Sequence, residues 1–150
     1  EERLRETLAS PSTNGGAAYK KYGARGATGE AADGFPDAVY CASRLSHYRE
    51  AGSEEPGALA LCDSMAALED TNVLHRGGSD GLAYVKREAA QIAGLPVSER
   101  RGALRRLDKD LTGRGLSPGG SADMLALAFL LERWQTMSAY LFINEKEDSQ

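Results

Sequence analysis

The sequence predicts an all-α protein, a bundle of about six or seven helices whose polar, glycine-rich loops gather at one end. Ala and Leu occur 23 and 18 times, whereas Val and Ile together occur only 6 times. This composition favours helices over strands. Apolar residues also recur every three or four positions, and no stretch alternates as a strand would. The 150 residues can build a hydrophobic core, so we expect one α-helical domain over 1–150.

Helices are expected between breaks at proline, glycine and serine. The chain begins with Glu1 inside an amphipathic pattern, which indicates a processed or truncated product or one segment of a longer polypeptide. The last expected helix is apolar nearly all round at first, which predicts central burial. The expected helices are 1–9, 14–22, 35–50, 54–69, 79–93, 98–112 and 121–143.

Three polar stretches, 23–34, 70–79 and 117–123, are interpreted as loops between these helices. The first has four glycines in twelve residues, which is long for a plain connection. The other two each contain Gly-Gly-Ser directly before an apolar helix, and such a helix start presents free N–H groups to an anion. The alternative is that all three are ordinary connections. We favour a ligand site because the second stretch also contains His75 and Arg76.

The polar residues of these stretches have the chemistry of a site for a magnesium-bound polyphosphate. Carboxylates and Asn suit Mg²⁺, and Arg and helix starts suit phosphates. A carboxylate or His75 could act as a general base on a hydroxyl. The candidate residues are Arg25, Glu30, Asp33, Asp70, Asn72, His75, Arg76, Gly77, Gly78, Ser117, Gly119, Gly120, Ser121 and Asp123, with Asp33 and Asp70 as the candidate metal ligands.

Composition argues against several other classes of protein. The net charge is -4, and the basic face of the helix at 98–112 has no interleaved aromatic residues for base stacking, so we expect no nucleic-acid partner. No apolar run approaches the roughly 20 residues that span a bilayer, so we expect no membrane association. Cys41 and Cys62 lie in helical patterns without metal-ligand spacing, which favours two buried free thiols in the cytoplasm.

Three blocks of sequence resemble the triphosphoribosyl-dephospho-CoA synthase family. Gly26 to Pro36 is similar to its Arg-Gly-Glu…Gly-Phe-Pro signature, interrupted here by an insertion between Gly26 and Glu30. Asp70-Thr71-Asn72-Val73-Leu74-His75-Arg76-Gly77-Gly78 resembles the second block, and Leu116-Ser117-Pro118-Gly119-Gly120-Ser121-Ala122-Asp123-Met124-Leu125-Ala126 resembles the third. The blocks occur in the family's order and span most of the chain.

The resemblance implies a transferase that moves the 5-triphosphoribosyl group of ATP to the 2′-hydroxyl of 3′-dephospho-CoA and releases adenine. The product is the prosthetic-group precursor of the acyl carrier subunit of citrate lyase or malonate decarboxylase, which makes that pathway a possible partner. In this interpretation Mg²⁺ and the triphosphate lie near Asp70, Asn72 and Arg76. Glu30 or Asp70 stabilises the oxocarbenium-like transition state, and His75 or Asp123 deprotonates the hydroxyl.

The resemblance covers only the C-terminal portion of the family. An upstream region with its own polar motif has no counterpart in these 150 residues. We therefore expect a homo-oligomer or a companion chain that carries the missing N-terminal portion. The alternatives to the transferase are a catalytically incomplete nucleotide- or CoA-binding module and a purely structural helical subunit.

Overall fold

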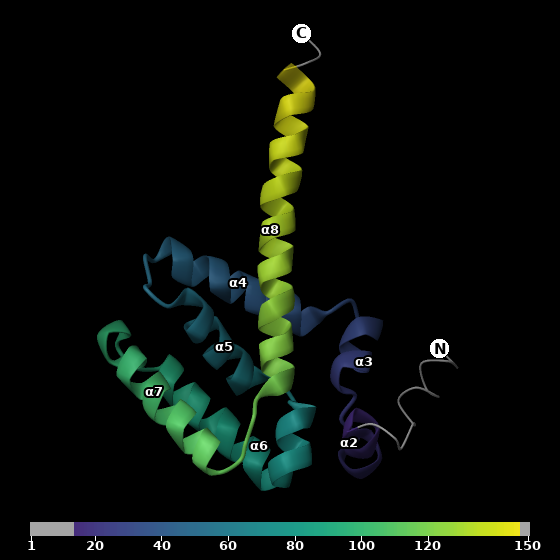
Figure 1. The fold of residues 1–150 in the computed structure, drawn as a ribbon, viewed down its shortest axis with the longest axis vertical. Helices are drawn as coiled ribbons and strands as arrows, with labels where there is room; N and C mark the ends of the chain where they lie inside the picture. The colour runs from purple at the N-terminus through teal and green to yellow at the C-terminus, as the bar shows by residue number, and fades with distance from the viewer. Residues whose placement is uncertain (1–13, 148–150) are drawn as a thin grey trace.

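The computed structural model describes residues 14–147, which form helices and no strand, so the all-α prediction is confirmed for this part of the chain. The helix expected over 1–9 lies outside the described residues. Figure 1 shows the arrangement of the helices. They are α2 (Asn14–Tyr22), α3 (Gly26–Ala32), α4 (Pro36–Glu50), α5 (Pro56–Ala67), α6 (Thr71–Ala93), α7 (Val97–Gly113) and α8 (Gly119–Glu147).

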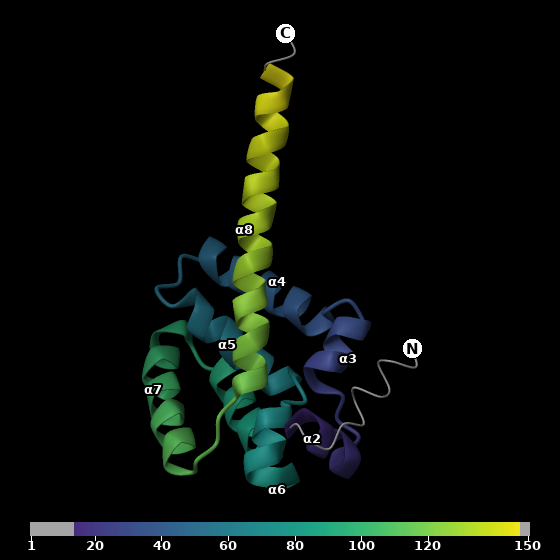
Figure 2. The ribbon, with the colours of Figure 1, turned by 45° about the vertical axis from the view of Figure 1, so that its right-hand side comes forward.

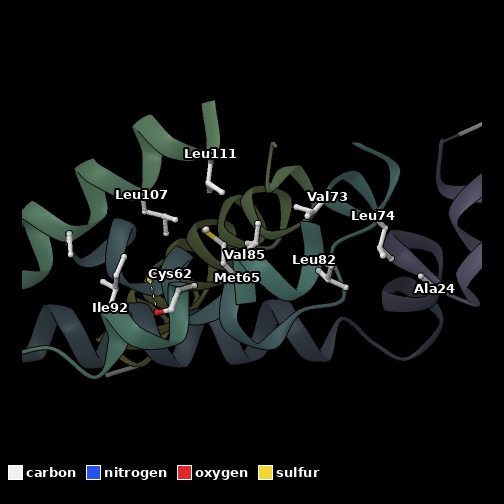
Figure 3. Close-up of a cluster of buried hydrophobic side chains, with 12 residues drawn as sticks. Ala24, Cys62, Met65, Val73, Leu74, Leu82, Val85, Ile92, Leu107 and Leu111 are labelled. Carbon is white, nitrogen blue, oxygen red and sulfur yellow. Dashed lines mark hydrogen bonds between the residues drawn. The ribbon is translucent and has the colours of Figure 1, made fainter. Parts of the chain in front are cut away.

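The main hydrophobic core lies where α5, α6 and α7 pack together (Figure 3). Its apolar stripe on α6 recurs at helical spacing, and α7 contributes a leucine stripe that faces it. Cys62 of α5 lies inside this core, and its Sγ is 3.3 Å from the carbonyl oxygen of Ala89. Cys41 is buried in a second cluster, between α4, α5 and α8. Both cysteines are buried and free, as the sequence predicts.

Helix α8 crosses α4 and α5 and then extends beyond the other helices, as both Figure 1 and Figure 2 show. Its first turns are packed, with Met124 and Ala128 buried. Leu130, Trp134 and Met137 are 61%, 67% and 51% exposed. The predicted central burial of this helix is therefore correct only on the face that meets α4 and α5.

The expectation of loops over 23–34 and 70–79 is wrong, because much of both stretches is helical. Helix α3 occupies 26–32, and α6 begins at Thr71 and not near Ser79. Glycine is a helix breaker by local preference. In this protein several of these glycines instead let one helix approach another, and the packing offsets their low helix propensity. A break does occur at Gly78, whose φ of 64° and ψ of -165° divide α6 into two helical segments.

No helix in the described part of the chain is long and apolar enough to cross a membrane.

Candidate functional site

Asp70 joins the starts of α6 and α8 through both of its carboxylate oxygens. Its Oδ1 accepts hydrogen bonds from the backbone N–H groups of Asn72 (2.9 Å) and Val73 (3.2 Å) and so caps α6. Its Oδ2 accepts from the backbone N–H of Ser121 (2.8 Å) and from the Ser121 hydroxyl (3.0 Å). Asp70 and Ser121 are buried, at 2% and 0% exposure. A carboxylate has about four acceptor positions, and here all of them are used.

The Gly119-Gly120 pair lets α8 come close enough for these hydrogen bonds. A Cβ atom on Gly119 would lie 2.4 Å from Nδ2 of Asn72, far inside van der Waals contact. A Cβ atom on Gly120 would lie 3.2 Å from the Asp70 carboxylate. The second and third sequence blocks therefore meet face to face. The third block does start a helix, as the sequence predicts, although α8 begins two residues earlier than expected.

The same two blocks meet again where Leu116 packs on α6. A Cβ atom on Gly77 would lie 2.4 Å from Cδ2 of Leu116. Directly beyond, Gly78 has the left-handed backbone that glycine adopts without strain, and the chain direction changes there. Gly77 and Gly78 thus end a short helical segment, and the longer segment of α6 starts after them.

The first block reaches the site through Gly26 at the start of α3. A Cβ atom there would lie 2.9 Å from Cγ2 of Thr71, beside Asp70. Arg25 and Asp33 form an exposed ion pair across α3, with 2.8 Å between Nη1 and Oδ2. The structure therefore brings all three blocks into contact, as the sequence predicts, although it does so mainly through helices.

Glu30 has a different position from the other carboxylates, because it caps the next helix. Its Oε2 accepts a hydrogen bond of 3.0 Å from the backbone N–H of Asp37 in the first turn of α4. Partial burial raises the pKa of Glu30, and the nearby carboxylates of Asp37 and Asp33 raise it further. The surroundings of Glu30 thus increase the proton affinity of its carboxyl group. A raised pKa of this kind suits a residue that acts as an acid or base.

The other candidate side chains are open to solvent or half-buried. His75, Arg76 and Asp123 are exposed, whereas Asn72 and Ser117 are half-buried. Arg76 makes a 3.4 Å contact from Nη1 to the carbonyl oxygen of Gly115, so it reaches from α6 to the α7–α8 connection. These exposed groups project from the two helices that Asp70 joins. They can meet a ligand without first breaking a buried contact.

The two proposed metal ligands already have partners in the structure. Asp33 is paired with Arg25, and the oxygens of Asp70 accept four hydrogen bonds. Within 14–147, no group of three or more His, Cys, Asp or Glu side chains is placed to hold a metal ion. These residues therefore do not form a preformed magnesium cage. Mg²⁺ often binds to one or two carboxylates plus substrate phosphates, and to bind it either Asp would have to exchange a present partner.

Sequence reasoning missed a buried polar cluster between α4 and α5. Asp63 is 5% exposed and accepts hydrogen bonds from the Arg44 guanidinium and from the Tyr48 hydroxyl, the latter at 2.9 Å. The guanidinium of Arg100 on α7 is 3.5 Å from the same hydroxyl. The signal in the sequence is a charged residue in the apolar run from Leu61 to Met65. The cluster connects three helices and lies outside the three blocks.

Comparison with known proteins relates these blocks to one enzyme family. The family described as CitG, ATP:dephospho-CoA triphosphoribosyl transferase, matches residues 1–140. The chain is 43% identical over 129 residues to a probable 2-(5''-triphosphoribosyl)-3'-dephosphocoenzyme-A synthase of Pectobacterium carotovorum, covering 84% of this chain and 42% of the relative.

Two further relatives have the same kind of name. The chain is 42% identical to the 2-(5''-triphosphoribosyl)-3'-dephosphocoenzyme-A synthase of Pectobacterium atrosepticum, covering 87% of this chain and 44% of that one. It is 40% identical to the synthase of Haemophilus ducreyi, covering 78% and 37%. The chain thus spans less than half the length of these relatives. No solved structure matches it.

Proposed function

Because this chain belongs to the ATP:dephospho-CoA triphosphoribosyl transferase family, we propose that it transfers the 5-triphosphoribosyl group of ATP to the 2′-hydroxyl of 3′-dephospho-CoA, with release of adenine. The observation that carries this proposal is the junction at Asp70, where the three blocks meet. A junction that only linked helices would not need His75, Arg76 and Asp123 projecting from the same helix starts.

In the proposed reaction the 2′-oxygen of the acceptor forms a bond to the anomeric carbon of ATP's ribose as the bond from that carbon to adenine breaks. The hydroxyl proton passes to a base, and adenine takes up a proton as it leaves. His75 and Asp123 are the proposed bases because both are exposed beside the junction. Glu30 is the proposed carboxylate beside the positively charged sugar, with Asp70 as the alternative.

The triphosphate is the group that the site must hold while its anhydride bonds stay intact. Arg76 is the proposed direct phosphate contact, because its guanidinium is exposed and has one weak contact to Gly115. The backbone at Gly77-Gly78 and Gly119-Gly120, with Asn72, Ser117 and Arg25, is proposed to supply further phosphate contacts. Ser121 is buried against Asp70, so it is proposed to support the start of α8 and not to contact the phosphates itself. Mg²⁺ is proposed to enter with the phosphates, whose charge it would neutralise.

The test is adenine release from ATP in the presence of Mg²⁺, with and without dephospho-CoA, followed by mass spectrometry of the CoA product. We expect release that depends on dephospho-CoA and that falls strongly in His75→Ala and Arg76→Gln. Arg105→Gln is the matched control, because Arg105 is exposed on α7 and forms no ion pair within the described residues. Full activity in Arg76→Gln would refute the proposed site.

The second candidate function is a catalytically incomplete module that binds nucleotide or CoA without transfer. The observation behind it is that the match covers 42–44% of the two Pectobacterium relatives, whose remaining length could hold residues that the transfer needs. In the assay this module would bind ATP and release no adenine. A structural helical subunit would bind neither substrate, and its His75 and Arg76 variants would behave as the unaltered chain does.

The exposed apolar side of α8 is the proposed surface for a companion polypeptide that corresponds to the uncovered part of the relatives. Leu130, Trp134 and Met137 have no cover within the described chain, and large exposed apolar residues of this kind mark interaction surfaces. A homo-oligomer is the other outcome, which the mass in light scattering would reveal. A cytoplasmic location and a place in an acyl carrier pathway, for citrate lyase or malonate decarboxylase, complete the proposal.

A further inference from the structure

A groove between α6 and α7, outside the three blocks, has no role in the function described so far. It holds about 350 Å³, and its wall is partly apolar, with Ile92 and Leu95 at one end and Tyr84 nearer the other. A second, shallower hollow of about 490 Å³ follows along α7. Arg106 and Asp110 line both hollows, so the two lie side by side along α7, and together they are called the channel.

The charged groups at the α7 end of this channel favour an anionic ligand, and the acidic Glu88 of the groove is paired with Arg87. Asp110 accepts hydrogen bonds from the Tyr84 hydroxyl and from Nε of Arg114, the latter at 2.9 Å. These two donors lower the pKa of Asp110. Arg114 is therefore already neutralised, and it stacks on the Tyr84 ring at 4.1 Å. Arg106 and Lys109 form no ion pair within the described residues, so two positive charges remain available.

The channel ends beside the Asp70 junction. Gly113 and Arg114 line its basic end. Gly115 follows them, and its carbonyl oxygen is 3.4 Å from the Arg76 guanidinium. Leu116 then packs against Gly77 on α6. A ligand with phosphates over the basic end could therefore reach the junction with one part and lie along the apolar end with another.

We propose that this channel binds the acceptor substrate, with the pyrophosphate of dephospho-CoA at Arg106 and Lys109 and its pantetheine arm along the groove between α6 and α7. The inference rests on the proposed function and specifies where its second substrate binds. A pyrophosphate carries two negative charges, which match the two free cations. The pantetheine arm is long and partly apolar, as the groove is. The adenosine end then points to the junction, where its 2′-hydroxyl must react.

The test measures binding of dephospho-CoA and of ATP separately, by calorimetry. Arg106→Gln/Lys109→Gln should weaken dephospho-CoA binding by about tenfold or more, because two charged contacts are lost. ATP binding should change by less than about twofold. The control Arg105→Gln/Arg133→Gln removes the same charge from exposed side chains that do not line the channel. It should leave both affinities unchanged.

Three results would overturn the inference. These are unchanged dephospho-CoA binding in the channel variant, an equal loss in the control variant, and an unaltered chain that binds ATP but no dephospho-CoA. A different result would refute the proposed function: binding of both substrates without adenine release. In that case a selective loss in the channel variant would still establish the channel as a dephospho-CoA site.

A cysteine trap locates the pantetheine arm independently. Gln91→Cys places a thiol in the groove, whereas Ala90→Cys places one on the exposed neighbouring position outside it. The thiol of dephospho-CoA is supplied as its mixed disulfide with thionitrobenzoate, and exchange releases the coloured thiol. We expect faster exchange with Gln91→Cys that excess dephospho-CoA suppresses. Equal rates for the two variants would exclude the arm from the groove. Cys41 and Cys62 are buried, which keeps the background low.

Discussion

Replacement of Asp70 should damage the fold as well as any chemistry, because this carboxylate holds the starts of α6 and α8 together. Asp70→Ala removes all four hydrogen bonds that the side chain accepts. Asp70→Asn keeps the shape of the side chain and one acceptor oxygen. Its NH2 group would then face either the two N–H groups at the cap of α6 or the backbone N–H of Ser121. A backbone N–H cannot accept a hydrogen bond, whereas the Ser121 hydroxyl could turn to accept one.

The cost follows from burial and from the number of partners left unsatisfied. Loss of a helix cap costs about 1 kcal/mol, and each buried donor left without an acceptor costs about 1–3 kcal/mol. Ser121 is fully buried and presents two donors to Asp70. Asp70→Ala should therefore lower the free energy of unfolding by roughly 3–7 kcal/mol, much of the stability of an ordinary domain. Asp70→Asn should cost about 1–3 kcal/mol.

Urea unfolding followed by circular dichroism measures these differences, provided that the slope with denaturant is unchanged. Ser121→Ala is the matched single variant. It removes the hydroxyl and keeps the backbone N–H bond, so it should cost about 1 kcal/mol. Because Asp70 and Ser121 share one contact, the double variant Asp70→Asn/Ser121→Ala should be less destabilised than the sum of the single variants.

Strict additivity in this cycle, or an Asp70→Asn variant as stable as the unaltered chain, would refute the structural role of Asp70. A stable Asp70→Asn variant without adenine release would instead favour direct participation of the carboxylate. The same reasoning makes Asp70 a poor first test of catalysis. His75 and Arg76 are better, because both are exposed and their loss leaves the junction intact.

Three further predictions concern packing and ionisation. Gly119→Ala should destabilise by about 1–3 kcal/mol in thermal unfolding, because its Cβ would overlap the Asn72 amide, whereas Gly113→Ala should be neutral or stabilising, since nothing lies within 4 Å of its Cβ. The pKa of Glu30 in the folded protein is raised from 4.5, so the free energy of unfolding should fall as pH rises from 4.5 through that raised pKa. Glu30→Gln keeps an acceptor for the α4 cap and should abolish this pH dependence, which thermal melts at a series of pH values measure. Burial raises the pKa of Cys62 to about 12, so its stabilising contribution is complete below pH 9 and is lost as pH rises toward about 12. A thiol reagent at pH 8 should therefore modify Cys62 only in denaturant. Rapid modification of the native chain would contradict this prediction.

Sequence reasoning predicted those parts of the structure that depend on local pattern. Pro36 marks the start of α4, and the leucine spacing of α7 places Leu107 and Leu111 in the core. The convergence of the three blocks was also expected, from their shared polar chemistry. The helical form of 71–77 was not, because Gly77-Gly78 is a break by local rules, and only the contact with Leu116 shows why glycine is needed there.

Other features depend on residues that are distant in the sequence and could not be assigned from spacing. Asp70 is both a local helix cap and the partner of Ser121, and the candidate list contained both residues without the bond between them. Asp63 was not singled out, because a single charge in an apolar helix does not identify the arginine that will neutralise it. The channel between α6 and α7 shows only its basic residues in the pattern of the helix at 98–112, because part of its apolar wall comes from a different helix.

The hydrogen bonds to the two oxygens of Asp70 should form at different stages of folding. One serves groups two and three positions along the chain, a contact that can form as soon as α6 nucleates. The other serves a residue 51 positions away, and closing a loop of that length costs entropy that only packed neighbours repay. The Ser121 contact should therefore form late, with a φ-value near zero. Partly folded chains would then contain a capped α6 without the junction, so we expect the candidate site to form after α6.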